Sequence, residues 1–173
     1  MFIKGIVLST LTAASIICCA GNAAVNTDFK LLKSPTVAQS WSNIGIKNIT
    51  FSAKDGVKPE IGFACFTVTE GKESGSIRQN IRKSVVKGKK YTLSAAIKGV
   101  NFTGGSAGLV IIDKGWKNSV GIRPLKIKNN QWTTVKSTVI AAENWQDVVL
   151  VFYINNMTPG KLMVSDIKLE EVK

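Results

Sequence analysis

Apolar and polar residues alternate in short runs along almost the whole chain, and this pattern constrains the fold more than any other feature. Segment 91–98, with the sequence YTLSAAIK, has the two-residue period of a half-buried β-strand. No stretch beyond the first 23 residues keeps the helical period over three turns, and turn signals such as Lys87-Gly88 separate the runs. We therefore expect an all-β protein with strands near 29–32, 46–52, 60–69, 76–83, 91–99, 107–113, 119–123, 131–140, 148–155 and 161–171.

The first 23 residues have the composition of a secretory signal peptide. A positive start at Lys4 precedes an apolar run that is shorter than the roughly 20 residues of a membrane-spanning helix. Cys18 and Cys19 suggest a lipoprotein as the alternative, but neither follows the small residue that normally precedes a lipidated cysteine. We therefore expect cleavage, and a single secreted or periplasmic domain of residues 24–173 that is monomeric and has no transmembrane segment.

The chain is strongly basic, with 23 Lys and Arg against 11 Asp and Glu. Only three of the basic residues are Arg, and the Lys are scattered, whereas proteins that read nucleic acids concentrate Arg for bidentate contacts. This distribution argues against a nucleic-acid partner. Two explanations remain, which are attraction to an acidic polysaccharide or other anionic surface, and simple solubility.

The residue inventory also limits the chemistry that is open to this chain. The sequence contains no His, which removes the commonest general base and metal ligand, and with them serine–histidine and zinc mechanisms. The acidic residues are scattered, so no carboxylate pair for glycoside hydrolysis is evident, although a lyase using Tyr and Arg stays open. Cys65 lies in an apolar run and is expected to be a buried small hydrophobe, so the domain has no internal disulfide.

Segment 148–154 differs from its neighbours because it is apolar at every position. Such a strand is either covered on both faces, or has one face in the core and the other lining an apolar groove. Phe152 and Tyr153 face opposite sides in either case, so one of the two points away from the core. Tyr153 would offer a ligand both a ring and a hydroxyl.

The order of several short motifs resembles the carbohydrate-binding modules of families four, nine and twenty-two. In that family an Asn-x-x-Phe-Glu opening is followed by a Trp, a Gln-x-Val strand, Pro-Gly-Lys-x-Tyr-x-Leu-Ser, Trp-x-x-Val and a closing Asp-Asp-Val-x-Leu strand. The corresponding positions here are 26–30, Trp41, 79–81, 87–94, 132–135 and 165–169. The resemblance spans essentially all of residues 24–173, and it implies an antiparallel β-sandwich of the jelly-roll, galactose-binding-domain-like type. It also implies that Trp41, Tyr91 and Trp132 are packing residues.

The resemblance bears on a metal site as well. Members of the family often hold a structural calcium ion with the opening Glu and an Asp of the closing pair, because a hard cation prefers several oxygen ligands. In this chain Lys30 stands in place of that Glu and Ser165 in place of the first Asp. Asp166 and Asp28 are the remaining candidate ligands for calcium, the one cofactor that the resemblance suggests.

Sugar recognition requires exposed aromatic rings for the C–H faces of the pyranose and polar groups for its hydroxyls. Trp116 and Trp145 lie in polar surroundings between strands, where the alternative role for each is a loop anchor. Along segment 76–83, glutamine and the two arginines fall on opposite faces; the resemblance favours the glutamine and an acidic ligand would favour the arginines. The candidate ligand-binding residues are therefore Trp116, Trp145, Tyr153, Gln79, Arg78 and Arg82.

Three classes of function follow. The first is non-catalytic binding of a polysaccharide, which is expected to be acidic if the charge serves binding, by aromatic stacking on a concave sheet or rim loops. The second is a secreted adhesin or protein-interaction domain whose sugar site has decayed. The third is a component that acts on glycosidic bonds, which the residue inventory disfavours. The first class predicts at least two of the aromatic candidates on one exposed concavity, and the second predicts that they are buried or scattered.

Overall fold

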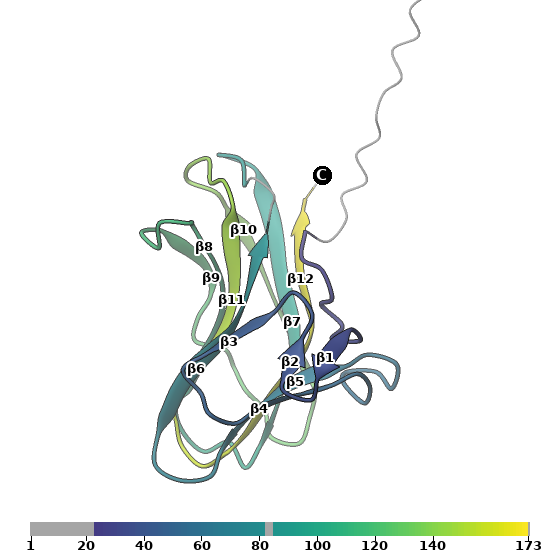
Figure 1. The fold of residues 1–173 in the computed structure, drawn as a ribbon. Coiled ribbons are helices and arrows are strands. Elements are labelled where there is room, and N and C mark those ends of the chain that lie inside the picture. Colours follow the sequence, from purple (N-terminus) through teal and green to yellow (C-terminus); the bar gives the residue numbers. More distant parts are fainter. Residues whose placement is uncertain (1–22, 82–84, 173) are drawn as a thin grey trace, which may run out of the picture.

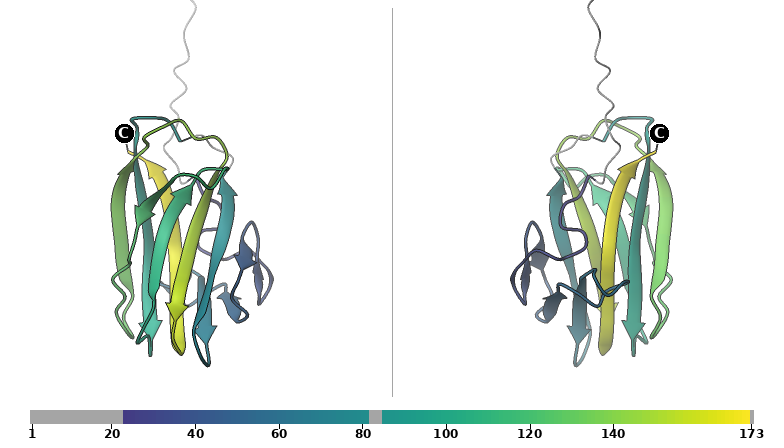
Figure 2. Two further views of the ribbon diagram at one scale, coloured as in Figure 1. Left: turned by 90° about the vertical axis from the view of Figure 1, so that its left-hand side faces the viewer. Right: turned by 90° about the vertical axis from the view of Figure 1, so that its right-hand side faces the viewer.

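A computed structural model describes residues 23–81 and 85–172, which form strands and turns and no helix. Two five-stranded antiparallel sheets pack face to face, and a short hairpin lies beside them (Figures 1 and 2). We call β10-β7-β12-β5-β4 the β12 sheet and β3-β6-β11-β8-β9 the β11 sheet. The strands are β1 (Leu32–Ser34), β2 (Val37–Ala38), β3 (Ser42–Ile44), β4 (Ile49–Ser52), β5 (Phe63–Val68), β6 (Glu73–Ile81), β7 (Lys90–Val100), β8 (Ser106–Ile112), β9 (Ser119–Ile122), β10 (Thr133–Ile140), β11 (Val148–Met157) and β12 (Gly160–Glu171).

This architecture confirms the predicted all-β antiparallel sandwich. The longer strands match the expected ranges to within a few residues, because their alternation is unambiguous. The strand expected at 29–32 is wrong: the positive φ of Phe29 bends the chain there, and the first strand begins at Leu32. Strands β2 and β3 were not predicted, because two or three residues are too few to produce an alternating pattern.

Some sequence-based expectations fall on residues that the structure does not describe. They are the signal peptide, apart from Ala23, and the lipidation alternative at Cys18 and Cys19. Arg82 also lies outside the described residues. In the part of the chain that is described, no helix is long and apolar enough to span a membrane.

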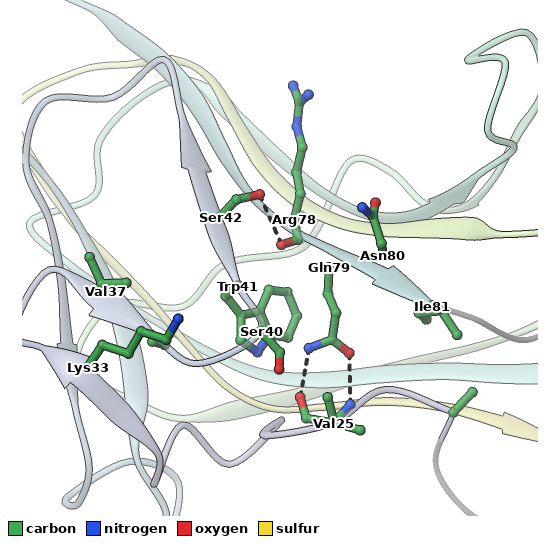
Figure 3. Close-up of a pocket in the computed structure, with 12 residues that line it drawn as sticks. Val25, Lys33, Val37, Ser40, Trp41, Ser42, Arg78, Gln79, Asn80 and Ile81 are labelled. Atoms are coloured by element: carbon green, nitrogen blue, oxygen red, sulfur yellow. Dashed lines mark hydrogen bonds between the residues drawn. The ribbon is translucent and has the colours of Figure 1, made fainter.

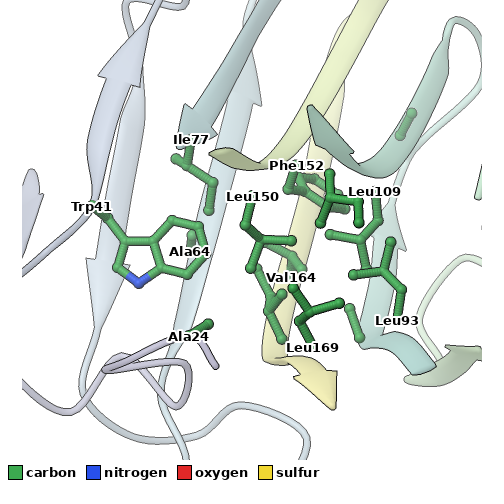
Figure 4. Close-up of a cluster of buried hydrophobic side chains, with 14 of the residues drawn as sticks. Ala24, Trp41, Ala64, Ile77, Leu93, Leu109, Leu150, Phe152, Val164 and Leu169 are labelled. Atoms are coloured by element: carbon green, nitrogen blue, oxygen red, sulfur yellow. The ribbon is translucent and has the colours of Figure 1, made fainter. Parts of the chain in front are cut away.

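The core lies between the two sheets and is built from the inward-facing half of each alternating strand (Figure 4). Phe66 of the β12 sheet and Phe152 of the β11 sheet meet across it with ring centroids 5.5 Å apart. Each such side chain contributes about 1.5–3 kcal/mol by leaving water. Tyr91 and Trp41 are buried in this core, as the resemblance implied.

Strand β11 settles the two interpretations of the fully apolar segment. Leu150, Phe152 and Ile154 point into the core, and Val149 and Val151 belong to a separate apolar cluster on the opposite face of the same sheet. Tyr153 packs against this second cluster. One face of β11 is therefore in the core, and the other faces the outside of the β11 sheet.

Candidate functional site

The outer face of the β11 sheet carries apolar residues that a solvent-facing sheet does not need. Val110, Val149 and Val151 are buried there although they point away from the core, and Ile112 and Tyr153 pack against them. The outer face of an antiparallel sheet is usually polar where it meets water, so an apolar cluster there marks this face as a candidate site.

The strand register places the outward-facing residues in rows that run across the β11 sheet. One row contains Ser42, Arg78, Val151, Val110 and Gly121, on β3, β6, β11, β8 and β9 in that order. The next row contains Ile44, Ser76, Tyr153 and Gly108. Each row thus has a polar or charged residue on β6 and apolar or small residues across β11 and β8.

Two adjoining hollows, of about 490 and 350 Å³, lie over these rows and share Ile44, Arg78 and Trp116. We call them together the outer groove. The remaining lining residues used below are Val110, Ile112, Arg123, Val149, Val151 and Tyr153. The outer groove is therefore an apolar floor with aromatic and cationic residues around it, which is a typical composition for a small-molecule or sugar site.

Trp116 is the most exposed ring of the outer groove, with half of its surface accessible. It lies in the turn between β8 and β9 and has a positive φ of 58°. Asp113 holds this turn. Its carboxylate accepts hydrogen bonds from the backbone N–H of Lys117 at 2.8 Å, and from the backbone N–H and the side-chain amide nitrogen of Asn118. The backbone carbonyl of Asp113 accepts a further hydrogen bond from the backbone N–H of Trp116 at 3.0 Å.

The electrostatics of Asp113 agree with this role. Partial desolvation raises the pKa of its carboxyl, but the hydrogen bonds from Lys117 and Asn118 and the positive charge of Lys117 outweigh it. The pKa of Asp113 therefore lies below its ordinary value. The charged carboxylate is thus the form that fixes the turn and presents the Trp116 ring.

Arg78 and Tyr153 complete the ring system of the outer groove. The Arg78 guanidinium lies over the Trp116 ring at 4.4 Å from its centroid, and its Nε donates to the Ser76 hydroxyl at 2.9 Å. The Tyr153 ring lies against Gly108, where an added Cβ would come within 2.5 Å of the ring atoms. Two of the predicted rings, Trp116 and Tyr153, therefore meet the same groove, as the glycan-binding interpretation predicted.

Arg123 is a groove residue that was not among the predicted ligand contacts. It follows β9 directly and lines the same hollow as Arg78 and Tyr153. One of its terminal nitrogens donates to the Ser119 hydroxyl at 3.2 Å. The signal was present in the alternation of segment 119–123, which places position 123 on the same side as Ser119.

Gln79 points away from the outer groove and has a structural role (Figure 3). Its side chain is only 3% exposed, and its amide oxygen accepts from the Val25 N–H at 2.8 Å and its amide nitrogen donates to the Val25 carbonyl at 2.7 Å. These bonds fix the N-terminal segment against β6. The position of Gln79 therefore does not support a contact with ligand in the outer groove, because alternation along β6 places Gln79 on the inner face of the sheet and Arg78 on the outer face.

Trp145 is buried and does not offer an exposed ring. It is 7% exposed and belongs to the main core. Its backbone pairs with Val85 through two hydrogen bonds of 2.8 and 2.9 Å, which turns the side chain inward. Its indole N–H finds no hydrogen-bond partner in the described part of the chain. Trp145 is thus the loop anchor that was its alternative role.

Trp132 also departs from its expected place. It is half-buried outside the core and lies against Phe63, at a centroid distance of 6.4 Å, and Lys98, both on the outer face of the β12 sheet.

Cys65 is buried on the same sheet, and burial raises the pKa of its thiol above the ordinary value, as expected for a structural cysteine.

The candidate calcium ligands do not form a suitable site. The Asp166 carboxylate accepts from the Lys168 ammonium at 2.8 Å, and Asp28 pairs with Lys30 at 3.6 Å. The residues of the described ranges contain no group of three acidic or other metal-ligating side chains. Each carboxylate already has a positive partner, so the residues present do not fit a calcium ion.

A larger hollow of about 680 Å³ lies beside β6, between the N-terminal segment and the β1–β2 hairpin, and it shares Ser42, Arg78 and Asn80 with the outer groove (Figure 3). It is lined by Gln79 and Trp41, but the Gln79 amide is used in bonds to Val25 and the Trp41 indole N–H donates to the Asn26 carbonyl. Because the Gln79 amide and the Trp41 indole N–H are already bonded and the Trp41 ring is only 6% exposed, we favour the outer groove, where the Trp116 ring is accessible, as the functional site.

Comparison with known proteins shows similarity in structure. No family model and no curated protein matches the sequence. The module TmCBM61, solved with β-1,4-galactotriose, aligns with a TM-score of 0.65 and 15% identity over 88% of this chain and 99% of its own. The CBM22-1 xylan-binding domain of Paenibacillus barcinonensis Xyn10C aligns at 0.62 and 11% identity, over 89% and 96%.

The chain has the fold of carbohydrate-binding modules. A further match is the enzymatically active domain of tailspike protein 4 from bacteriophage CBA120, at a TM-score of 0.65 and 13% identity over 87% of this chain. The chain spans only 21% of that larger protein, so the match is to one of its parts. The matches to TmCBM61 and to the CBM22-1 domain confirm the jelly-roll sandwich that was expected from the motifs.

Proposed function

We propose that the chain is an exported, non-catalytic carbohydrate-binding module of the family four, nine and twenty-two type, which holds a polysaccharide in the outer groove. The observation that carries this proposal is that the exposed Trp116 ring, the partly buried Tyr153 ring and a floor of valines meet on the outer face of the β11 sheet. The C–H faces of pyranose rings stack on such rings, and the neighbouring polar groups meet the hydroxyls. Export rests on the composition of residues 1–23.

One feature of the outer groove supports binding without catalysis. Among the described residues, the one acid that lines the outer groove is Asp147, and its carboxylate is paired with the Lys114 ammonium at 3.4 Å. A single paired carboxylate lacks the second group that hydrolysis of a glycosidic bond requires.

The test is affinity gel electrophoresis of residues 24–173 in gels that contain soluble polysaccharides, with and without Trp116→Ala. We expect retardation by at least one polysaccharide, and its loss in the variant. Trp132→Ala is a matched control, because it removes a half-buried Trp from the opposite sheet and should retain binding. Retardation that survives Trp116→Ala would contradict the proposed site. Release of shorter products from the polysaccharide would contradict the non-catalytic function.

A further inference from the structure

The distribution of arginine suggests what kind of polysaccharide the outer groove selects. The chain uses Lys for 20 of its 23 basic residues and Arg for only three. Two of these three, Arg78 and Arg123, line the same hollow of the outer groove, and the third lies outside the described residues. A guanidinium presents a planar fork that matches a carboxylate or sulfate, whereas an ammonium acts as a point charge.

Neither arginine is neutralised by an acid within residues 23–81 and 85–172. The ion pairs of these residues all involve Lys, and the hollow that Arg78 and Arg123 share has no Asp or Glu in its lining. Each guanidinium donates one hydrogen bond to a serine hydroxyl, on Ser76 or Ser119. These bonds orient the two side chains, the Arg78 guanidinium also lies over the Trp116 ring, and neither arginine forms an ion pair with a carboxylate of the described residues.

The two arginines start from strands on opposite sides of the apolar floor. Arg78 is on β6 and Arg123 follows β9, with β11 and β8 between them. Three spacings between neighbouring strands separate the two backbones by roughly 14 Å across the sheet, and the Arg78 side chain reaches from β6 towards the Trp116 ring. A saccharide of a few rings can therefore stack on Trp116 and Tyr153 while its charged groups reach either guanidinium.

We propose that the outer groove recognises an anionic polysaccharide, with Arg78 and Arg123 pairing with carboxylate or sulfate groups on the sugar. This inference rests on the proposed function, because it specifies the ligand of the same groove. Uronic-acid polymers supply the carboxylates and sulfated glycans supply the sulfates, and the shared chemistry is a planar or trigonal set of oxygens with negative charge.

The experiment measures binding of residues 24–173 to oligogalacturonate, to the same oligosaccharide after reduction of its carboxyl groups, and to a sulfated oligosaccharide from heparin. Calorimetry at fixed ionic strength removes differences in salt screening. We expect the carboxyl-reduced probe to bind at least about tenfold more weakly than at least one of the anionic probes, since a charge-assisted hydrogen bond is worth about a factor of ten or more. The anionic probe that binds identifies the source of the charge.

Variants separate recognition from general attraction. Arg123→Lys keeps the charge and removes the fork, and Arg123→Gln removes both, so we expect a stepwise loss for the anionic probe. Lys136→Ala deletes one exposed charge from the far face of the β12 sheet and should change binding by less than about twofold.

Failure of this inference is distinguishable from failure of the proposed function. Equal binding of the native and carboxyl-reduced probes, with neither Arg123 variant affected and Trp116→Ala still deleterious, would overturn anionic recognition and keep glycan binding. An equal loss in Lys136→Ala and Arg123→Gln would show nonspecific charge attraction and would also overturn it. Absence of binding to all three probes, together with no retardation by any neutral polysaccharide, would overturn both.

Discussion

Replacing Gln79 by Glu tests whether this residue belongs to the fold rather than to the ligand site. The substitution keeps the side-chain shape but replaces the amide group that donates to the Val25 carbonyl at 2.7 Å. At neutral pH the new carboxylate either faces that carbonyl oxygen while charged and buried, or stays protonated. Staying protonated at pH 7.5 costs about 4 kcal/mol, because each unit above the ordinary pKa of about 4.3 costs about 1.4 kcal/mol. We therefore expect a loss of up to about 4 kcal/mol in the free energy of unfolding.

The pH dependence gives this prediction its sign. Burial raises the folded pKa of the introduced Glu above its unfolded value, so the native state retains a proton that the unfolded state releases. The deficit relative to wild type should grow as pH rises above about 4.3 and shrink to below about 1 kcal/mol at pH 4, where a protonated Glu can again donate to Val25.

Urea unfolding followed by tryptophan fluorescence at pH 7.5 and pH 4 measures both values. Asn80→Asp is the matched control, because this exposed neighbour gains the same charge and should change stability by less than about 0.5 kcal/mol. A Gln79→Glu protein as stable as wild type at pH 7.5, or a deficit that does not change with pH, would refute the reasoning.

Three further predictions follow from the same contacts. Trp145→Ala should cost about 3–5 kcal/mol of unfolding free energy, whereas Trp116→Ala should cost less than about 1; similar losses would contradict their different burial, and urea unfolding measures both. Asp113→Ala should weaken polysaccharide retardation severalfold with little change in Tm. Because the pKa of Asp113 is lowered, the contribution of its carboxylate to wild-type binding should persist at the ordinary Asp pKa of about 4 and be lost only below it. Wild-type binding that falls between pH 7 and 5 would contradict this pH dependence. Calcium or a chelator should shift Tm by less than about 1 °C, because lysines already pair with Asp28 and Asp166, and a rise of several degrees with calcium would show a metal site.

Periodicity predicted the sandwich well because each long strand carries its own signal. The alternation in β7 and the fully apolar run in β11 required no knowledge of their neighbours. The same logic placed Phe152 and Tyr153 on opposite faces, which the structure confirms. By contrast, strands β2 and β3 form because β6 and the hairpin offer them partners, and two or three residues cannot reveal this by themselves.

The site was only partly predictable, because polar surroundings in the sequence do not determine burial. Trp116 and Trp145 both lie in polar loops, yet the Asp113 turn leaves the first exposed and pairing with Val85 buries the second. The alternation of segment 119–123 indicates the side of the sheet on which Arg123 lies, but its place beside Arg78 and Tyr153 depends on strands far away in sequence. Long-range pairing of this kind decides which side chains meet, and a single sequence does not contain it in a readable form.

The central claim is tested most directly by the indole N–H signals of the four Trp in a proton–nitrogen NMR spectrum, recorded during titration with the polysaccharide that retards the protein most. We expect the Trp116 signal to shift progressively with ligand, and the signals of Trp41, Trp132 and Trp145 to stay nearly unchanged, because these three lie outside the outer groove. Shifts confined to Trp41 or Trp132 would place the ligand in the hollow beside the N-terminal segment or on the β12 sheet, and would contradict the account.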